Sequence, residues 1–215
     1  MIKVVVFDFD GTLVDSNLIK ERMFERVVQG IPGGVEALNE AKKLGGDRFR
    51  TFGEISRRLE AEPSRRGGMT RRLAAEYGRG CLRAIAATSE RRGASSALRF
   101  AHRRGLRLYL NTATPQRDIE PLLRARGWAG MFTGAYGAPD SKVGILLRIM
   151  RRERVAARNV VMVGDSADDL DAALRTGAWF VGVTAEARLQ LRPPFGMIDL
   201  RRLPVVLRQL DGGLR

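Results

Sequence analysis

A series of short apolar runs, separated by stretches of helical periodicity, constrains the fold of this chain more than any other feature. The first run, Ile2 to Phe7, is continuous and rich in β-branched residues, which is typical of a strand buried on both faces. Similar runs and helical stretches then alternate, and this alternation predicts an α/β fold with a parallel sheet covered on both sides. The later strands are expected at 106–112, 131–137, 159–165, 178–183 and 196–200.

One long segment interrupts the alternation, because it has helical patterns and no convincing strand. We therefore predict a core domain of residues 1–14 and 91–215 and an inserted helical domain of residues 15–90. The stretch EPSRRGGMT (62–70) is predicted to be a loop. Four apolar residues at helical spacing are expected in the core of the insertion: Phe49, Phe52, Ile55 and Leu59.

The charge balance is strongly basic, with 38 Lys and Arg against 24 Asp and Glu and a net charge of +14. Such a charge attracts anionic substrates or a nucleic-acid backbone. The Arg-Arg pairs are scattered along the chain and form no basic block with interleaved aromatic residues. This distribution favours solvated helix faces and general anion affinity over a dedicated nucleic-acid site.

Composition also indicates the compartment. The 44% hydrophobic and 29% charged content is typical of a folded globular protein. The first strand begins at residue 2, so we expect no signal peptide, and no apolar run is long enough to span a bilayer. A single cysteine, Cys81, excludes an internal disulfide framework. The sequence therefore predicts a cytoplasmic protein without a membrane segment.

Polar residues gather where the predicted strands end. Asp8 and Asp10 follow the first strand, Thr112 follows the second and Asp165 the fourth, while Lys142 stands at a predicted helix start. In open α/β sheets, ligands bind beyond the carboxyl ends of the strands. Buried carboxylates need a positive partner, and oxygen ligands suit Mg²⁺. The set predicts a site for a divalent cation and a phosphoryl group.

These residues resemble the haloacid dehalogenase superfamily of aspartate-nucleophile phosphohydrolases. The likeness rests on DFDGT (8–12), a Thr after the second strand, a Lys, and GDSADD (164–169), and it covers nearly the whole chain. It implies a doubly wound parallel core with an inserted α-helical cap. The cap points to the branch of phosphoglycolate phosphatase and β-phosphoglucomutase.

The resemblance implies a role for each acidic residue. Asp8 would be the nucleophile that forms an aspartyl-phosphate, and with an ordinary pKa of ~3.9 it would be ionised at neutral pH. Asp10 would protonate the leaving oxygen and then deprotonate water. Mg²⁺ would bind Asp8, the Asp10 backbone carbonyl and Asp165, and Asp169 would hold its waters. Asp168 and Asp169 could instead simply favour a helix N-terminus, and the spacing favours Asp169 over Asp168 as the functional residue.

The phosphoryl group would be held by uncharged and basic residues. Thr112 and Lys142 would bind its oxygens, and Gly11 and Ala113 would complete the substrate contacts. In NTATP (111–115), Asn111 and Thr114 are rivals of Thr112. Lysine at position 142 is notable in a chain that prefers arginine, because it suggests that a compact ammonium is needed there.

The helical segment is expected to select the substrate. The stretch LGGDRFRTF (44–52) is similar to Gly-Gly-x-x-Arg cap segments of some haloacid dehalogenase-like hydrolases, which makes Arg48 a candidate substrate contact. A solvated arginine is the alternative interpretation.

Absent motifs narrow the chemistry. The only histidine is His102, which excludes sites that need several histidines, and Ala87 stands where a Cys-x5-Arg phosphatase loop at Cys81 would need arginine. No G-x-x-x-x-G-K-[ST] loop is present, which argues against a nucleotide-driven kinase.

The sequence therefore predicts a Mg²⁺-dependent phosphatase, monomeric or homodimeric, that acts on a small phosphorylated metabolite. The nearest alternative is a phosphomutase, although the helical segment lacks the histidine common in that branch. A basic nucleic-acid-binding protein on the same scaffold is the second alternative.

Overall fold

A computed structural model describes residues 1–183, 195–197 and 199–212 of the chain. The chain divides into two compact units, which we describe separately. The core unit consists of Met1–Asp15 and Thr88–Arg215, and the helical unit consists of Ser16–Ala87. Among the described residues, none of the helices combines the length and the apolar character that a membrane span requires.

The core unit contains a six-stranded sheet in the order β3-β2-β1-β4-β5-β6, and every pair of neighbours is parallel. This confirms the predicted α/β class. The two strands beside β1 bring segments far apart in sequence to the same edge, because Phe7 lies between Leu110 and Val163. The strands are β1 (Val4–Phe7), β2 (Arg107–Pro115), β3 (Gly134–Ala138), β4 (Val160–Gly164), β5 (Trp179–Val183) and β6 (Phe195–Met197).

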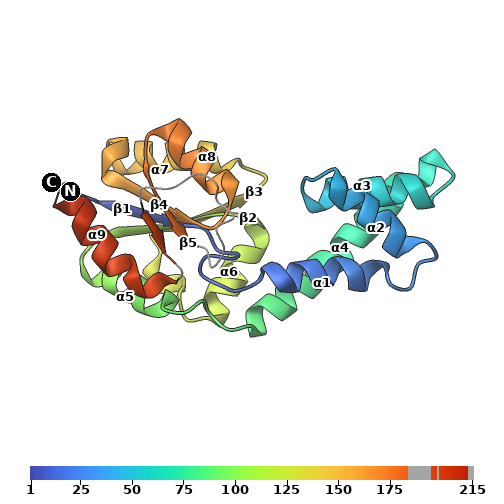
Figure 1. The fold of residues 1–215 in the computed structure, drawn as a ribbon, viewed down its shortest axis with the longest axis horizontal. Helices are drawn as coiled ribbons and strands as arrows, with labels where there is room; N and C mark the ends of the chain where they lie inside the picture. Colours follow the sequence, from blue (N-terminus) through green and yellow to red (C-terminus); the bar gives the residue numbers. More distant parts are fainter. Residues whose placement is uncertain (184–194, 198, 213–215) are drawn as a thin grey trace. The chain divides into compact units, whose positions relative to one another are not determined.

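Helices cover both faces of this sheet, with α7 and α8 on one face and α5 and α9 on the other (Figure 1). Helix α9 is absent from the sequence prediction, although its buried residues at 203, 206, 207 and 210 repeat at helical spacing. The helices are α5 (Ala94–Arg103), α6 (Gln116–Ala125), α7 (Lys142–Glu153), α8 (Ala167–Thr176) and α9 (Leu203–Asp211).

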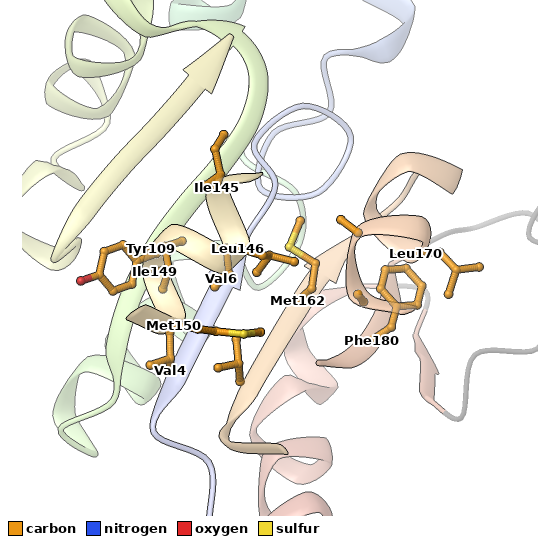
Figure 2. Packing of buried hydrophobic residues seen from close by; sticks show 13 residues of the cluster. Val4, Val6, Tyr109, Ile145, Leu146, Ile149, Met150, Met162, Leu170 and Phe180 are labelled. Carbon is orange, nitrogen blue, oxygen red and sulfur yellow. The ribbon is translucent and has the colours of Figure 1, made fainter. Parts of the chain in front are cut away.

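One apolar cluster fixes α7 and α8 on the sheet (Figure 2). Val4 and Val6 point to the same face of β1, as alternate residues of a strand do. Helix α7 supplies Ile145, Leu146 and Ile149, all fully buried against this face. Because Lys142 begins α7, the packing of these residues also places Lys142 at the sheet edge where β1 ends.

The helical unit has four helices and no strand, as the sequence indicates. Its interior contains three aromatic rings from three helices: the Phe24 centroid lies 4.3 Å from Tyr77 and 5.3 Å from Phe52. The helices are α1 (Asn17–Val28), α2 (Gly34–Lys43), α3 (Arg48–Leu59) and α4 (Pro63–Ala87).

Two sequence predictions for this unit are wrong. Residues 62–70 are not a loop, because α4 already begins at Pro63, where proline is tolerated since the first helical N–H has no partner within the helix. The Arg66 guanidinium donates 2.8 Å to the Glu60 carbonyl, and the Thr70 hydroxyl lies 3.0 Å from Ser56 Oγ. These tertiary contacts outweigh the cost of about 1 kcal/mol for each glycine in the first turns.

The second error concerns Phe49. Its side chain is 52% exposed, whereas Phe52 and Ile55 of the same predicted face are fully buried. Phe49 lies in the first turn of α3, and the Arg48 guanidinium lies over its ring at 5.3 Å. A cation over the ring makes exposure of this aromatic residue less costly.

Two neighbouring leucines of α7 test the packing in Figure 2. Leu146→Ala should lower the free energy of unfolding by about 2–5 kcal/mol, because it opens a cavity in a close-packed cluster. Leu147 is 45% exposed, so Leu147→Ala is the matched control and should change that free energy by less than about 0.5 kcal/mol. Urea denaturation measures both variants, and equal losses would contradict the observed orientation of α7.

Candidate active site

Asp8 is the first residue after β1, and its backbone is tied to the neighbouring strand. The Asp8 N–H donates 2.9 Å to the Val163 carbonyl, so the ends of β1 and β4 are joined directly before Asp165. The Asp8 side chain is only 4% exposed. A carboxyl group at this point is therefore buried at the carboxyl edge of the sheet.

Asp169 is oriented by a capping box at the start of α8. Its carboxylate accepts from both the backbone N–H and the hydroxyl of Ser166, while the Ser166 hydroxyl accepts from the Asp169 N–H. Gly164 leaves the space that Asp169 occupies, since a Cβ on Gly164 would lie 2.4 Å from the Asp169 Cβ. Asp168, its rival, is exposed on the helix surface.

The carboxylates of Asp8, Asp165 and Asp169 form an acidic cluster whose oxygens lie within 4.8 Å of one another. The Lys142 ammonium lies 2.6 Å from Asp169 Oδ1 and 3.3 Å from Asp8 Oδ1. Thr12 donates 3.0 Å to Asp165 Oδ1. Residues predicted from three separate stretches of sequence thus meet at one edge of the sheet.

The cluster carries more negative charge than Lys142 balances. Burial raises the pKa of Asp8 to about 8. The Lys142 ammonium opposes this rise, and the charges of the other aspartates add to it. Burial alone would lower the pKa of Lys142, but Asp8 and Asp169 outweigh it and raise the pKa. With all its groups ionised, the set of three carboxylates and one ammonium has a charge of −2.

Asp8 Oδ1 shows the imbalance at a single atom. It is buried and makes none of the hydrogen bonds found among the residues that the structure describes, and its contact with Lys142 is an ion pair of 3.3 Å. Carboxylate oxygens of this kind fit a hard divalent cation, whose charge equals the excess. The donor set of the acidic cluster therefore fits a metal ion.

Asp10 is not one of the three carboxylates of the acidic cluster, although its charge also raises the pKa of Asp8. Its side chain accepts a 2.6 Å hydrogen bond from the Thr114 hydroxyl. The Thr112 hydroxyl is buried and accepts from the Thr114 N–H at 3.2 Å, whereas Ala113 is exposed. Asn111 is also buried and donates 2.9 Å to the Lys142 carbonyl. The three candidates of NTATP therefore make three different contacts.

Gly11 forms the turn that carries the chain away from Asp10. Its φ of 79° is in the left-handed region, which favours glycine. Its N–H donates 2.7 Å to the Val14 carbonyl, and its own carbonyl accepts from the Arg91 guanidinium at 2.7 Å. The turn is thus held from both sides.

Arg48 belongs to the helical unit and not to this set. It begins α3, where Asp47 caps the helix by accepting from the Arg50 N–H at 2.9 Å. Its guanidinium lies against α4 at Gly78, where an added Cβ would be 3.4 Å from Arg48 Nη1.

Three residues of the site escaped the sequence analysis: Thr12, Gly164 and Ser166. Each lies within DFDGT (8–12) or GDSADD (164–169). Ser166 and Asp169 have the spacing of a capping box, so their contact could have been predicted from the sequence. The close approach of Gly164 to Asp169 depends on tertiary geometry and had no sequence signal beyond the glycine itself.

The chain is similar in sequence to two phosphoglycolate phosphatases. The phosphoglycolate phosphatase of Pseudomonas putida is 27% identical over 194 residues, covering 85% of this chain and 69% of that protein. The phosphoglycolate phosphatase of Pseudomonas fluorescens is 28% identical over 195 residues, with the same coverage.

Solved structures show the same fold at lower identity. A predicted phosphoglycolate phosphatase from Haemophilus somnus superposes with a TM-score of 0.77 at 18% identity, covering 96% of this chain and 98% of the other. A putative β-phosphoglucomutase from Thermotoga maritima gives 0.72 at 22% identity, covering 97% and 99%.

A family model described as haloacid dehalogenase-like hydrolase matches residues 2–177. This match extends from the first strand through α8, so it includes every member of the acidic cluster and Lys142. With most of its length matched, the chain belongs to the haloacid dehalogenase-like hydrolases.

Proposed function

We propose that this protein is a Mg²⁺-dependent phosphatase that hydrolyses a small phosphomonoester through an aspartyl-phosphate on Asp8. The observation that carries the proposal is the buried acidic cluster, in which Asp8 lies beside Lys142 and keeps one oxygen without a hydrogen bond. Two relatives are named phosphoglycolate phosphatases, so 2-phosphoglycolate is the first substrate to test.

Asp8, Asp165 and the Asp10 carbonyl would hold Mg²⁺, with Asp169 orienting its waters. When bound, the ion supplies positive charge that favours ionised Asp8 and offsets the charge of the phosphoryl oxygens. The ordinary pKa of an aspartate, ~3.9, predicts that Asp8 is already ionised at neutral pH. Its raised pKa of about 8 means that ionisation needs this added charge.

In the first step, the Asp8 carboxylate attacks phosphorus, forming an O–P bond as the bond to the leaving oxygen breaks. Asp10 donates a proton to that oxygen, so the product leaves as an alcohol. Lys142 and the Thr112 hydroxyl contact the phosphoryl oxygens. Because Thr112 Oγ1 accepts from the Thr114 N–H, its own proton is directed elsewhere and suits this donor role.

In the second step, Asp10 removes a proton from water, which attacks phosphorus and breaks the bond to Asp8. Phosphate leaves, Asp8 is again a carboxylate and Asp10 again carries a proton. One carboxyl group thus serves as acid and base in turn, which requires that it stay in place between the steps.

A phosphomutase of the same fold is the second candidate, and the Thermotoga maritima structure is a putative β-phosphoglucomutase. Hydrolysis is favoured because the single histidine, His102, lies on α5 of the core unit and the helical unit has none. Some arginines pair with nearby acidic residues, as Arg57 and Arg58 do with Glu54, and such pairing does not favour nucleic-acid binding.

The nucleophile is tested by Asp8→Asn, which removes the attacking carboxylate and keeps its shape. We expect kcat for 2-phosphoglycolate or 4-nitrophenyl phosphate to fall more than about a hundredfold while the protein stays folded. Asp168→Asn is the control, because Asp168 is exposed in the first turn of α8, lies outside the acidic cluster and should leave kcat unchanged. Phosphate release and circular dichroism measure both properties, and a variant that retains a tenth of the activity would contradict the role of Asp8.

The charge imbalance predicts how stability depends on pH without metal. Folding raises the pKa of Asp8 from 3.8 to about 8, so between these pH values the folded protein holds a proton that the unfolded chain has released. The stabilisation that comes from this proton is lost as pH rises through 8. The melting temperature of metal-free protein should therefore fall from pH 5 to pH 8, and less steeply in Asp8→Asn. Mg²⁺ should restore wild-type stability at pH 8. Equal slopes in both proteins, or no response to Mg²⁺, would contradict the proposed site.

Arg48 is proposed as a contact to the leaving group, and Arg50 offers a control on the same turn of α3. Arg48→Ala should lower kcat/KM for the best metabolite substrate about ten- to a hundredfold, the effect of one lost charged hydrogen bond. The effect on 4-nitrophenyl phosphate and the effect of Arg50→Ala should be small. Equal losses on both substrates would show instead that Arg48 supports the fold.

A further inference from the structure

We infer that Thr114 positions the Asp10 carboxyl group for proton transfer to the leaving oxygen, an inference that rests on the proposed function. Thr114 Oγ1 donates to Asp10 Oδ2 at 2.6 Å, and both residues are 8% exposed. A hydroxyl bound to a carboxylate at this distance is among the stronger protein hydrogen bonds. Burial limits competition from bulk water, so the bond helps to orient the Asp10 carboxyl group.

An irregularity in β2 brings Thr114 to Asp10. The strand pairs regularly with β3 up to Asn111, which lies opposite Tyr136, but Pro115 then lies opposite Ala138. Three residues of β2, Thr112 to Thr114, therefore face one residue of β3, Gly137. A bulge of this kind changes the direction of the side chains within it, and bulges are enriched beside active sites.

The facing strand is built to accept this bulge. A Cβ on Gly137 would lie 2.2 Å from the Thr114 carbonyl oxygen, so no larger residue fits without moving the Thr114 backbone. The Gly137 N–H donates 2.9 Å to Gln116 Oε1, which gives that backbone group a partner outside the regular ladder. Gly137 thus helps to define where the Thr114 hydroxyl lies.

The hydrogen bond from Thr114 distinguishes the two oxygens of the Asp10 carboxyl group. Oδ2 accepts the hydrogen bond from Thr114, and in this proposal Oδ1 carries the proton. Because Asp10 acts in both steps, a carboxyl group that rotated between them would lose its alignment with the leaving oxygen. The Thr114 bond opposes that rotation, which makes Thr114 a positioning residue.

This role has a consequence that a purely structural role lacks. Proton donation matters most when the leaving oxygen is strongly basic, and little when the leaving group is a stable anion. Loss of the Thr114 hydroxyl should therefore impair turnover of phenyl phosphate more than turnover of 4-nitrophenyl phosphate. The two substrates have nearly the same shape, so the comparison isolates proton transfer from binding.

The test uses Thr114→Val and Thr114→Ser with Mg²⁺, and kcat/KM reports the phosphoryl-transfer step. Thr114→Val should lose about ten- to a hundredfold with phenyl phosphate and less than about threefold with 4-nitrophenyl phosphate. Thr114→Ser keeps the hydroxyl and should stay within about threefold of wild type on both. Thr176→Val is the matched control, because its hydroxyl donates 2.8 Å to the Ala172 carbonyl within α8, and it should show no dependence on the leaving group.

Gly137→Ala provides an independent variant that leaves Thr114 in the sequence. The added Cβ should displace the Thr114 backbone and produce the same preference for the better leaving group. Melting temperatures establish that each variant is folded. Equal losses on the two substrates, failure of serine to restore activity, or a fully active Thr114→Val would overturn the inference while the proposed function stands. A wild-type protein that releases no phosphate would contradict the proposed function, and the inference with it.

Discussion

The Lys142 ammonium between two buried carboxylates is the interaction on which the rest of the site depends. It lies 2.6 Å from Asp169 and 3.3 Å from Asp8, and without it these groups would be buried together uncompensated. The position of Lys142 follows from the core, because α7 is fixed by its apolar face against β1 and β2. Asn111 adds a direct tie by donating to the Lys142 carbonyl. The apolar packing of α7 against the sheet thus determines where the positive charge of Lys142 lies at the edge of the sheet.

Lysine suits this position better than the arginine that the chain uses elsewhere. Three carboxylates lie within 4.8 Å of one another, and a compact ammonium can contact two of them and still leave room for a cation. A planar guanidinium is larger and makes directed pairs, so it would occupy the space between the strand ends. Partial neutralisation is the useful outcome here, because Lys142 alone does not balance the three carboxylates, and their oxygens suit the divalent ion that the proposed reaction requires.

The fold could be predicted from the sequence because its signals are local. Continuous apolar runs such as Val4 to Phe7 identify buried strands, and polar residues directly after them must lie at one edge of a parallel sheet. The first turns of α4 could not be predicted, because contacts of Arg66 with the Glu60 carbonyl before the helix and of Thr70 with Ser56 of α3 outweigh the local glycine signal. Within the site, the positions of Asp8 and Asp165 followed from strand ends, and that of Lys142 followed from a predicted helix start. The contact of Thr114 with Asp10 could not be predicted in this way. It depends on a bulge in β2, and the sequence of β2 does not show that Gly137 of the facing strand leaves space for that bulge.

The charge of the whole chain and the charge of the cluster have opposite signs, and this contrast has a physical consequence. A net charge of +14 attracts anions, such as the proposed phosphorylated substrates, over distances of about a Debye length, whereas the acidic cluster alone would repel them at close range. A bound divalent ion removes that local repulsion. Capture of an anion and its reaction therefore depend on different charges: the dispersed arginines act on approach, and the neutralised cluster acts on contact. The same division explains why the basic residues need not form a single patch, since a field summed over the whole surface requires no particular arrangement of its sources.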